Sequence, residues 1–368
     1  MFSRSFYNTI HSFHRSIRFL TTSSIAKKPN YAFAFDIDGV LLKGKKPIAE
    51  AKSAIQLLNG DNPQNRRVPF VLLTNGGGMT EAAKANQVSN LIDVEISPDQ
   101  VILSHSPMQM LTKKYKEKRV LVVGGKGKIC ADLAKGYGFD NVVTPQDLHH
   151  WNNSLWPYSQ PKDITEAAYQ DYSTLPIEAV MMFHDSFDWG RDLQVMLDAL
   201  CSHDGIIGTM KKDFSTQSMP VYFSNNDLIW STDFPTPRLG QGAFKEALEG
   251  LYKALTGGSL ISESFGKPHG ATYFYAERVI SRHHQTLYGE PFVPEHVYAI
   301  GDNPAADIKG ANAHGWSSLL VRTGVHTGPG NSQEYPADVV CDNVLDAVRW
   351  AINKEEIVVA KFYLIIQC

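Results

Sequence analysis

Residues 31–43 read YAFAFDIDGVLLK, a run of five apolar residues followed closely by two aspartates. The apolar run is continuous rather than alternating, which predicts a strand that is buried on both faces. A strand of that kind is typical of a parallel sheet covered by helices. The polar residues Asp36 and Asp38 would then lie just beyond the carboxyl end of the strand.

Two more apolar runs end in polar residues in the same way. The run 68–73 (VPFVLL) leads into Thr74 and Asn75, and the run 297–300 (VYAI) leads into Gly301 and Asp302. In open α/β sheets, ligands bind beyond the carboxyl ends of the strands. We therefore expect one functional site that collects these residues at a single edge of a sheet.

The remaining pattern predicts two α/β units. Segments with helical spacing (49–58, 80–91 and 344–352) separate the strands, so we expect a Rossmann-like, doubly wound parallel sheet. In the middle of the chain, candidate strands and helices predict a second, smaller α/β domain inserted into the first. The candidate strands are 119–123, 142–143, 179–183, 206–209 and 221–222, and the candidate helices lie near 128–136 and 191–201. The polar stretch 146–174 is expected to be a long loop.

The amino-acid composition argues against several classes of protein and of site. The chain has 368 residues, 43% of them hydrophobic and 20% charged, as in soluble globular proteins. Its 35 Lys and Arg against 38 Asp and Glu give a net charge of −3, so a nucleic-acid partner is not expected. The four cysteines lie far apart with no CxxC pair, which argues against a disulfide framework or a zinc site and favours a reducing compartment.

The first residues form a distinct segment. No acidic residue precedes Asp36, and an apolar series at positions 2, 6, 10, 13, 17 and 20 would form one stripe of a basic helix. Residues 1–28 are therefore interpreted as a mitochondrial transit peptide, which predicts a location in the mitochondrion, in the matrix. A membrane-surface helix that stays attached is the alternative. No segment is expected to span a membrane.

The polar residues at the strand ends suggest phosphate chemistry. Carboxylates of Asp36, Asp38 and Asp302 would repel one another, and a divalent cation between them would remove that penalty. Oxygen ligands without His or Cys suit Mg²⁺. One carboxylate could attack phosphorus while another donates and then removes a proton. Thr74, Asn75 and the amides of the following glycines could donate hydrogen bonds, and Lys267 could supply a positive charge.

Four segments, in this order, resemble the motifs of the haloacid dehalogenase (HAD) superfamily of phosphohydrolases. They are FAFDIDGVLLKG (33–44), LLTNGGG (72–78), GKPHGATYFYAE (266–277) and AIGDNPAADIKGAN (299–312). Four motifs in the correct order on the expected elements are a stronger signal than any one of them. The long insertion resembles the C2-type cap of subfamily IIA. The chain looks most similar to the mitochondrial branch known as cat eye syndrome critical region protein 5-like hydrolases.

The resemblance implies a domain division and a reaction. The catalytic core would comprise 31–112 and 262–352, the cap 113–261, and the tail 353–368 does not resemble the family's ending. The activity implied is Mg²⁺-dependent hydrolysis of a small phosphorylated metabolite through an aspartyl-phosphate intermediate. A homo-oligomer is left open.

The resemblance also implies a role for each site residue. Asp36 would be the nucleophile and Asp38 the general acid/base. Phosphate would be bound by Thr74, Asn75, Gly76 and Lys267, with Lys267 also catalytic. Mg²⁺ would be held by Asp36, Asp38 and Asp302, with Asn303 and Asp307 in support.

The sequence is compatible with three other interpretations. The chain could be a scaffold or ligand-binding protein that keeps the pocket without useful turnover, since a fold does not guarantee a function. It could cleave a carbon–halogen bond, although a halide needs no proton and Asp38 would then be idle. The segment VVGGKGKIC (122–130) lacks a full dinucleotide-binding pattern and is expected to be a tight turn. His184, where many capped relatives carry a smaller or apolar residue, argues against simply transferring a substrate from them.

Overall fold

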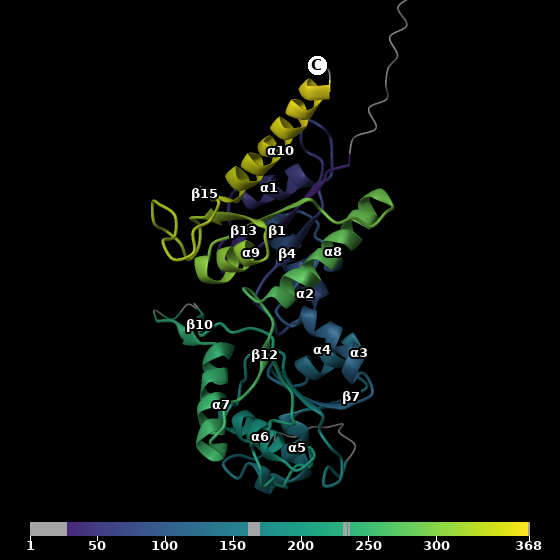
Figure 1. The fold of residues 1–368 in the computed structure, drawn as a ribbon, viewed down its shortest axis with the longest axis vertical. Helices are drawn as coiled ribbons and strands as arrows, with labels where there is room; N and C mark the ends of the chain where they lie inside the picture. The colour runs from purple at the N-terminus through teal and green to yellow at the C-terminus, as the bar shows by residue number, and fades with distance from the viewer. Residues whose placement is uncertain (1–27, 161–169, 231–233, 235, 367–368) are drawn as a thin grey trace, which may run out of the picture.

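The computed structural model describes residues 28–160, 170–230, 234 and 236–366. Apart from Lys28, the predicted transit peptide therefore lies outside the described residues. Two parallel sheets, each flanked by helices, follow one another along the long axis of the molecule (Figure 1). The predicted fold class, a Rossmann-like core with an inserted α/β cap, is confirmed.

The larger sheet forms the core. Its six strands are all parallel and lie in the order β15-β14-β13-β1-β4-β5. They are β1 (Tyr31–Phe35), β4 (Phe70–Leu73), β5 (Val101–Ile102), β13 (His296–Gly301), β14 (Ser317–Val321) and β15 (Val339–Cys341). The strand that carries the first apolar run, β1, lies between β13 and β4, so its end is placed at the centre of the sheet edge.

The side chains of β1 alternate between two hydrophobic layers. Phe33 and Phe35 pack with α1 (Ala51–Leu58), α2 (Glu81–Ile92) and α10 (Val344–Ile366). Ala32 and Ala34 face the opposite layer, which includes α8 (Gly270–Tyr288) and α9 (Lys309–Ala313). Both faces are buried because helices cover both sides, as the continuous apolar run predicts.

The smaller sheet belongs to the cap. Its five strands are parallel, in the order β12-β9-β8-β6-β7. They are β6 (Arg119–Val123), β7 (Asn141–Val143), β8 (Ala179–Met182), β9 (Val221–Phe223) and β12 (Glu263–Ser264). The strand β12 lies beyond residue 261, so the cap sheet continues past the boundary expected from the sequence.

Helices cover both faces of the cap sheet as well. One face packs with α5 (Pro145–Trp151), α6 (Trp189–Cys201) and α7 (Gln241–Thr256), and the other with α4 (Ile129–Tyr137). The remaining elements are short: the hairpins β2 (Leu42–Lys43) with β3 (Lys46–Pro47) and β10 (Ile229–Trp230) with β11 (Arg238–Leu239), the helix α3 (Thr112–Tyr115), the 3₁₀ turns Pro98–Gln100, Ser106–Leu111 and Asn153–Leu155, and the π-helical turn η4 (Pro304–Ile308). None of the described helices combines the length and apolar composition that crossing a membrane requires.

Three expectations about local structure were wrong. Residues 206–209 form a turn rather than a strand, because Gly205 and Gly208 adopt positive φ and Thr209 bonds back to the Ile206 carbonyl. The stretch 146–174 begins as helix α5, since Thr144 caps Pro145–Trp151 in a capping box with Asp147. The C-terminal tail continues helix α10 to Ile366, well past residue 352.

Candidate active site

Three carboxylates meet beyond the carboxyl ends of the central core strands. Asp36 follows β1, and its backbone N–H donates to the Ile300 carbonyl of β13 at 2.9 Å, which continues the ladder. Asp302 follows β13, and Asp307 lies in the turn η4 that comes next. Carboxylate oxygens of Asp36, Asp302 and Asp307 all lie within 4.8 Å of one another. The topology thus brings together acids that are far apart in the sequence.

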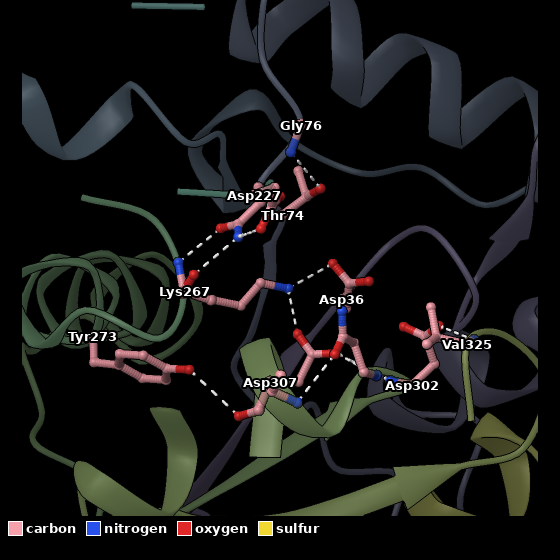
Figure 2. A network of polar contacts seen from close by, with 12 residues as sticks. Asp36, Thr74, Gly76, Asp227, Lys267, Tyr273, Asp302, Asp307 and Val325 are labelled. Carbon is pink, nitrogen blue, oxygen red and sulfur yellow. Dashed lines mark hydrogen bonds and ion pairs between the residues drawn. The ribbon is translucent and has the colours of Figure 1, made fainter. Parts of the chain in front are cut away.

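A buried lysine neutralises part of this charge. Lys267 is only 5% exposed, and its Nζ lies 2.7 Å from Asp36 Oδ1 and 2.6 Å from Asp307 Oδ1 (Figure 2). Lys267 precedes helix α8 and reaches the strand ends from the segment that returns from the cap to the core. A single ammonium group therefore bridges the residue after β1 and the turn after β13.

The buried charges perturb one another. Burial raises the pKa of Asp36 well above its ordinary value, and the Lys267 ammonium opposes that rise. Burial, with the neighbouring Asp307 charge, raises the pKa of Asp302 to about 6. Burial by itself would lower the pKa of Lys267, but the Asp307 and Asp36 carboxylates raise it above the ordinary value. The cluster thus carries more negative charge than its one lysine balances.

Backbone amides hold two of the carboxylates in place. Asp307 Oδ2 accepts from the N–H groups of Asp302 at 3.1 Å and Asn303 at 2.9 Å. Asp302 Oδ2 accepts from the Val325 N–H at 2.6 Å. These bonds fix the two side chains before any ligand arrives, which is the preorganisation that a charged site needs.

Glycine is required where two loops approach Asp302. A Cβ at Gly39 would lie 2.3 Å from Asp302 Oδ2, and a Cβ at Gly324 would lie 2.0 Å from the same atom. Gly39 also has φ of +90°, a conformation that other residues rarely adopt. The glycine of the DIDG segment is therefore needed for both its backbone conformation and its small size.

Thr74 and Gly76 form a turn beside the carboxylates. Thr74 is 4% exposed, and its Oγ1 accepts from the Gly76 N–H at 3.0 Å. The Gly76 carbonyl accepts from the Ser104 N–H at 3.1 Å, which anchors this loop to the residues after β5. In Figure 2, Thr74 and Gly76 are drawn above the side chains of Asp36 and Lys267.

The side chain of Asn75 forms its hydrogen bonds with other groups of the protein. Its Oδ1 accepts from the Lys267 N–H at 2.7 Å, and its Nδ2 donates to the Lys267 carbonyl at 3.0 Å and to Asp227 Oδ1 at 3.1 Å. Asp227 follows the cap strand β9 and was not among the residues predicted from the sequence. The rule that singled out polar residues after core strands would have found it, had it been applied to the cap strands.

The other predicted residues lie at different depths. Asp38 has an exposed side chain and is not part of the carboxylate group, in which Asp307 stands instead. Asn303 caps the turn η4, its Oδ1 accepting from the Ala305 N–H.

His184 follows the cap strand β8 and lies directly against the backbone of Gly78 in the core. A Cβ at Gly78 would fall 2.4 Å from the Cδ2 atom of His184. The carboxyl ends of both sheets therefore face the same seam between core and cap.

The residues present fit a hard divalent cation. Asp36, Asp302 and Asp307 offer carboxylate oxygens at close range, and no His or Cys joins the group within the described part of the chain. Oxygen-only donor sets of this kind suit Mg²⁺. A cation would also relieve the desolvation that raises the pKa values of Asp36 and Asp302.

Comparison with known proteins gives a consistent result. Residues 33–140 match the family described as haloacid dehalogenase-like hydrolase, and residues 264–347 match one described as HAD-hydrolase-like. The chain is 39% identical over 359 residues to a mitochondrial hydrolase of Saccharomyces cerevisiae, which covers 92% of this chain and 98% of that protein.

A relative in fission yeast is a larger protein. The chain is 41% identical over 345 residues to a protein of Schizosaccharomyces pombe named as a cardiolipin synthase (CMP-forming) and mitochondrial hydrolase fusion. The match covers 92% of this chain and 56% of the fusion protein, so the chain spans little more than half of that relative.

Solved structures share the fold. The glycerol phosphate phosphatase of Mycobacterium tuberculosis, in complex with magnesium, superposes with a TM-score of 0.56 at 18% identity. The match covers 88% of this chain and 77% of that one. At such low identity the similarity establishes the arrangement of core and cap.

Proposed function

The chain belongs to the haloacid dehalogenase-like hydrolases, and from this membership we propose that it is a Mg²⁺-dependent phosphatase acting on a small phosphorylated metabolite. The observation that carries the proposal is the position of Lys267 between Asp36 and Asp307, with Asp302 beside them. Phosphoryl transfer depends mainly on positioning and on neutralising charge, and this cluster supplies both.

The geometry of Asp36 suits nucleophilic attack. Its Oδ1 is paired with the Lys267 ammonium, which leaves Oδ2 to attack phosphorus. The bond from Asp36 Oδ2 to phosphorus would form as the bond to the leaving oxygen breaks, giving an aspartyl-phosphate. The Lys267 ammonium opposes the rise in the pKa of Asp36 that burial causes, so it favours the ionised carboxylate, and it would face the incoming phosphoryl oxygens.

Asp38 is proposed as the general acid and base. It lies two residues beyond the nucleophile and its side chain is exposed, so it can exchange protons with water. It would give a proton to the leaving oxygen and then take one from the water that hydrolyses the aspartyl-phosphate. Thr74 and the Gly76 loop would bind phosphoryl oxygens, and bound Mg²⁺ would supply further charge neutralisation through Asp36, Asp302 and Asp307.

Release of inorganic phosphate tests the proposal. The purified chain is assayed with p-nitrophenyl phosphate, glycerol phosphate and CMP, in Mg²⁺ and in EDTA. We expect Mg²⁺-dependent turnover of at least one ester, and we expect Asp36→Asn to abolish it. The control Asp61→Asn, which changes an exposed residue of the core domain, should keep the wild-type turnover. Turnover that survives Asp36→Asn, or no turnover of any ester across a wider metabolite panel, would refute the phosphatase.

A mitochondrial location, in the matrix, belongs to the same proposal. It is supported by the basic, acid-free sequence 1–28 and by two relatives that are named as mitochondrial hydrolases. A fluorescent fusion of the full chain should enter mitochondria, and the same fusion without residues 1–28 should not. Import of the shortened fusion would refute the role of the leader.

A further inference from the structure

The side-chain amide of Asn75 is saturated by protein partners. Its Oδ1 accepts from the Lys267 N–H, and the two hydrogens of Nδ2 go to the Lys267 carbonyl and to Asp227 Oδ1. An amide group offers two donor hydrogens, and here both are used. In this arrangement Asn75 therefore has no hydrogen left for a phosphate, which gives its side chain a different task.

Asp227 is firmly part of the cap. Its N–H donates to Asn225 Oδ1 at 3.0 Å, and its carbonyl accepts from the Gly242 N–H at the start of α7 at 2.9 Å. A Cβ at Gly240 would lie 2.5 Å from that carbonyl, so α7 packs tightly against this loop. The bond from Asn75 to Asp227 consequently joins the core to a fixed point on the cap.

Asn75 is also connected, through Lys267, to the carboxylates of the proposed active site. Two hydrogen bonds join the side-chain amide of Asn75 to the main chain of Lys267, one to its N–H and one to its carbonyl. Together they fix the position of the Lys267 main chain. From that main-chain position the Lys267 side chain reaches Asp36 at 2.7 Å and Asp307 at 2.6 Å. The chain of contacts Asp227–Asn75–Lys267–Asp36 thus runs from the cap to the proposed nucleophile. Figure 2 labels Asp227, Lys267 and Asp36.

We infer that Asp227 and Asn75 are positioning residues that place Lys267 correctly only when the cap is docked on the core. The inference rests on the proposed function for its effect on turnover. When the cap moves away, Asn75 loses its charged partner and the Lys267 main chain loses part of its support. The ammonium group then no longer holds Asp36 in the orientation needed for attack, so chemistry is confined to the closed state.

The size of the effect follows from the bonds involved. A hydrogen bond to a carboxylate is stronger than one between neutral groups, and small misplacements of a catalytic group are costly. We expect Asp227→Ala and Asn75→Ala each to lower kcat by about 10- to 100-fold. KM for a small ester should change by less than about 3-fold, since neither side chain is placed on the substrate.

Conservative and double variants separate positioning from other roles. Asp227→Asn keeps an oxygen that can accept from Asn75, so its kcat should stay within about 3-fold of the wild type. The double variant Asn75→Ala/Asp227→Ala should be no worse than the poorer single variant, because both remove the same contact. The exposed cap residue Asp132 supplies the control Asp132→Ala, which should match the wild type.

Two kinetic outcomes would overturn the inference. One is full additivity of the two alanine variants, which would mean that Asn75 and Asp227 act separately. The other is an Asp227→Asn variant as impaired as Asp227→Ala, which would mean that the negative charge of Asp227, and not its bond to Asn75, is what matters.

Hydrogen exchange decides the question without turnover, and so separates it from the proposed function. In Asp227→Ala, the amides of residues 265, 266, 267 and 269 should exchange about 10-fold faster or more than in the wild type, because the main chain of Lys267 is held through Asn75. Amides of β1 and β13 should be unchanged, which shows that the core is folded. If residues 265–269 exchange at the wild-type rate, the contact does not position Lys267, whatever the enzyme assay shows.

Discussion

Gly324 lies so close to Asp302 that a Cβ on the glycine would fall 2.0 Å from the Asp302 Oδ2. The loop after β14 thus closes over a carboxylate that already accepts a hydrogen bond from the next residue, Val325. The site depends on this close approach, because the backbone N–H of Val325 can reach Asp302 only if no side chain intervenes. Residues that perform no chemistry therefore shape the carboxylate group.

Gly324→Ala should displace Asp302 or the loop. We expect turnover to fall by at least about 100-fold, since small misplacements at a charged site are costly. Gly328→Ala, in the same loop, is the matched control, because its nearest contacts at 3.6 Å leave room for a methyl group. Phosphate release by both variants is the measurement, and equal activities would contradict the steric argument.

Asp302→Asn should stabilise the metal-free protein while removing its response to Mg²⁺. Burial raises the pKa of Asp302 to about 6, so between its unfolded value of 3.8 and 6 the native state binds more protons than the unfolded chain. The stability of the metal-free protein therefore falls as pH rises through that window, because the buried Asp302 carboxyl becomes ionised. This loss of stability remains at higher pH. The substitution removes this penalty, a gain of about 1–3 kcal/mol at pH 7.5.

Thermal unfolding with and without Mg²⁺ checks this prediction. The wild type should melt at a higher temperature when Mg²⁺ is present, because a ligand that binds only the native state stabilises it. Asp302→Asn should melt above the wild type in EDTA and should gain little from Mg²⁺. A wild-type melting temperature that does not respond to Mg²⁺ would argue against a metal at this group.

Tyr137→Phe should remove hydrogen bonds between cap and core and lower the free energy of unfolding. The Tyr137 hydroxyl, on cap helix α4, donates to Glu81 Oε1 of core helix α2 at 2.5 Å and lies 2.7 Å from His105 Nδ1. Removing it leaves a carboxylate and a buried imidazole with fewer partners, at a cost of about 1–3 kcal/mol. Denaturant unfolding measures the loss, and Tyr158→Phe, at an 81% exposed residue, should show none.

Acid should destabilise the protein through His283. Its Nδ1 lies 3.2 Å from the Phe70 nitrogen and 3.0 Å from the Phe70 carbonyl oxygen, and burial lowers the pKa of His283 to about 4. The unfolded state therefore binds more protons than the native state between pH 6.5 and 4, so stability falls as pH is lowered through that window. The loss from this residue is at most about 3 kcal/mol. His283→Asn keeps an acceptor that does not titrate, and its stability should fall less between pH 6.5 and 4 than that of the wild type.

Local sequence was enough to locate the core strands and the residues that follow them. The apolar runs before Asp36, Thr74 and Asp302 became β1, β4 and β13, because strands buried on both faces need continuous apolar residues. Parallel pairing then places their carboxyl ends at one edge. Errors arose where local hydrogen bonds decide the conformation, as in the capped helix α5 and the glycine turn at 205–208.

The sequence by itself thus determined which polar residues stand at the ends of core strands, because that depends on neighbours along the chain. Tertiary structure alone decided that Asp307 joins the carboxylate group while Asp38 faces solvent. It also decided that Asn75 binds Asp227, 152 residues away, and the Lys267 main chain, 192 residues away. Contacts at such separations depend on how cap and core pack together, and no local pattern of residues records that packing.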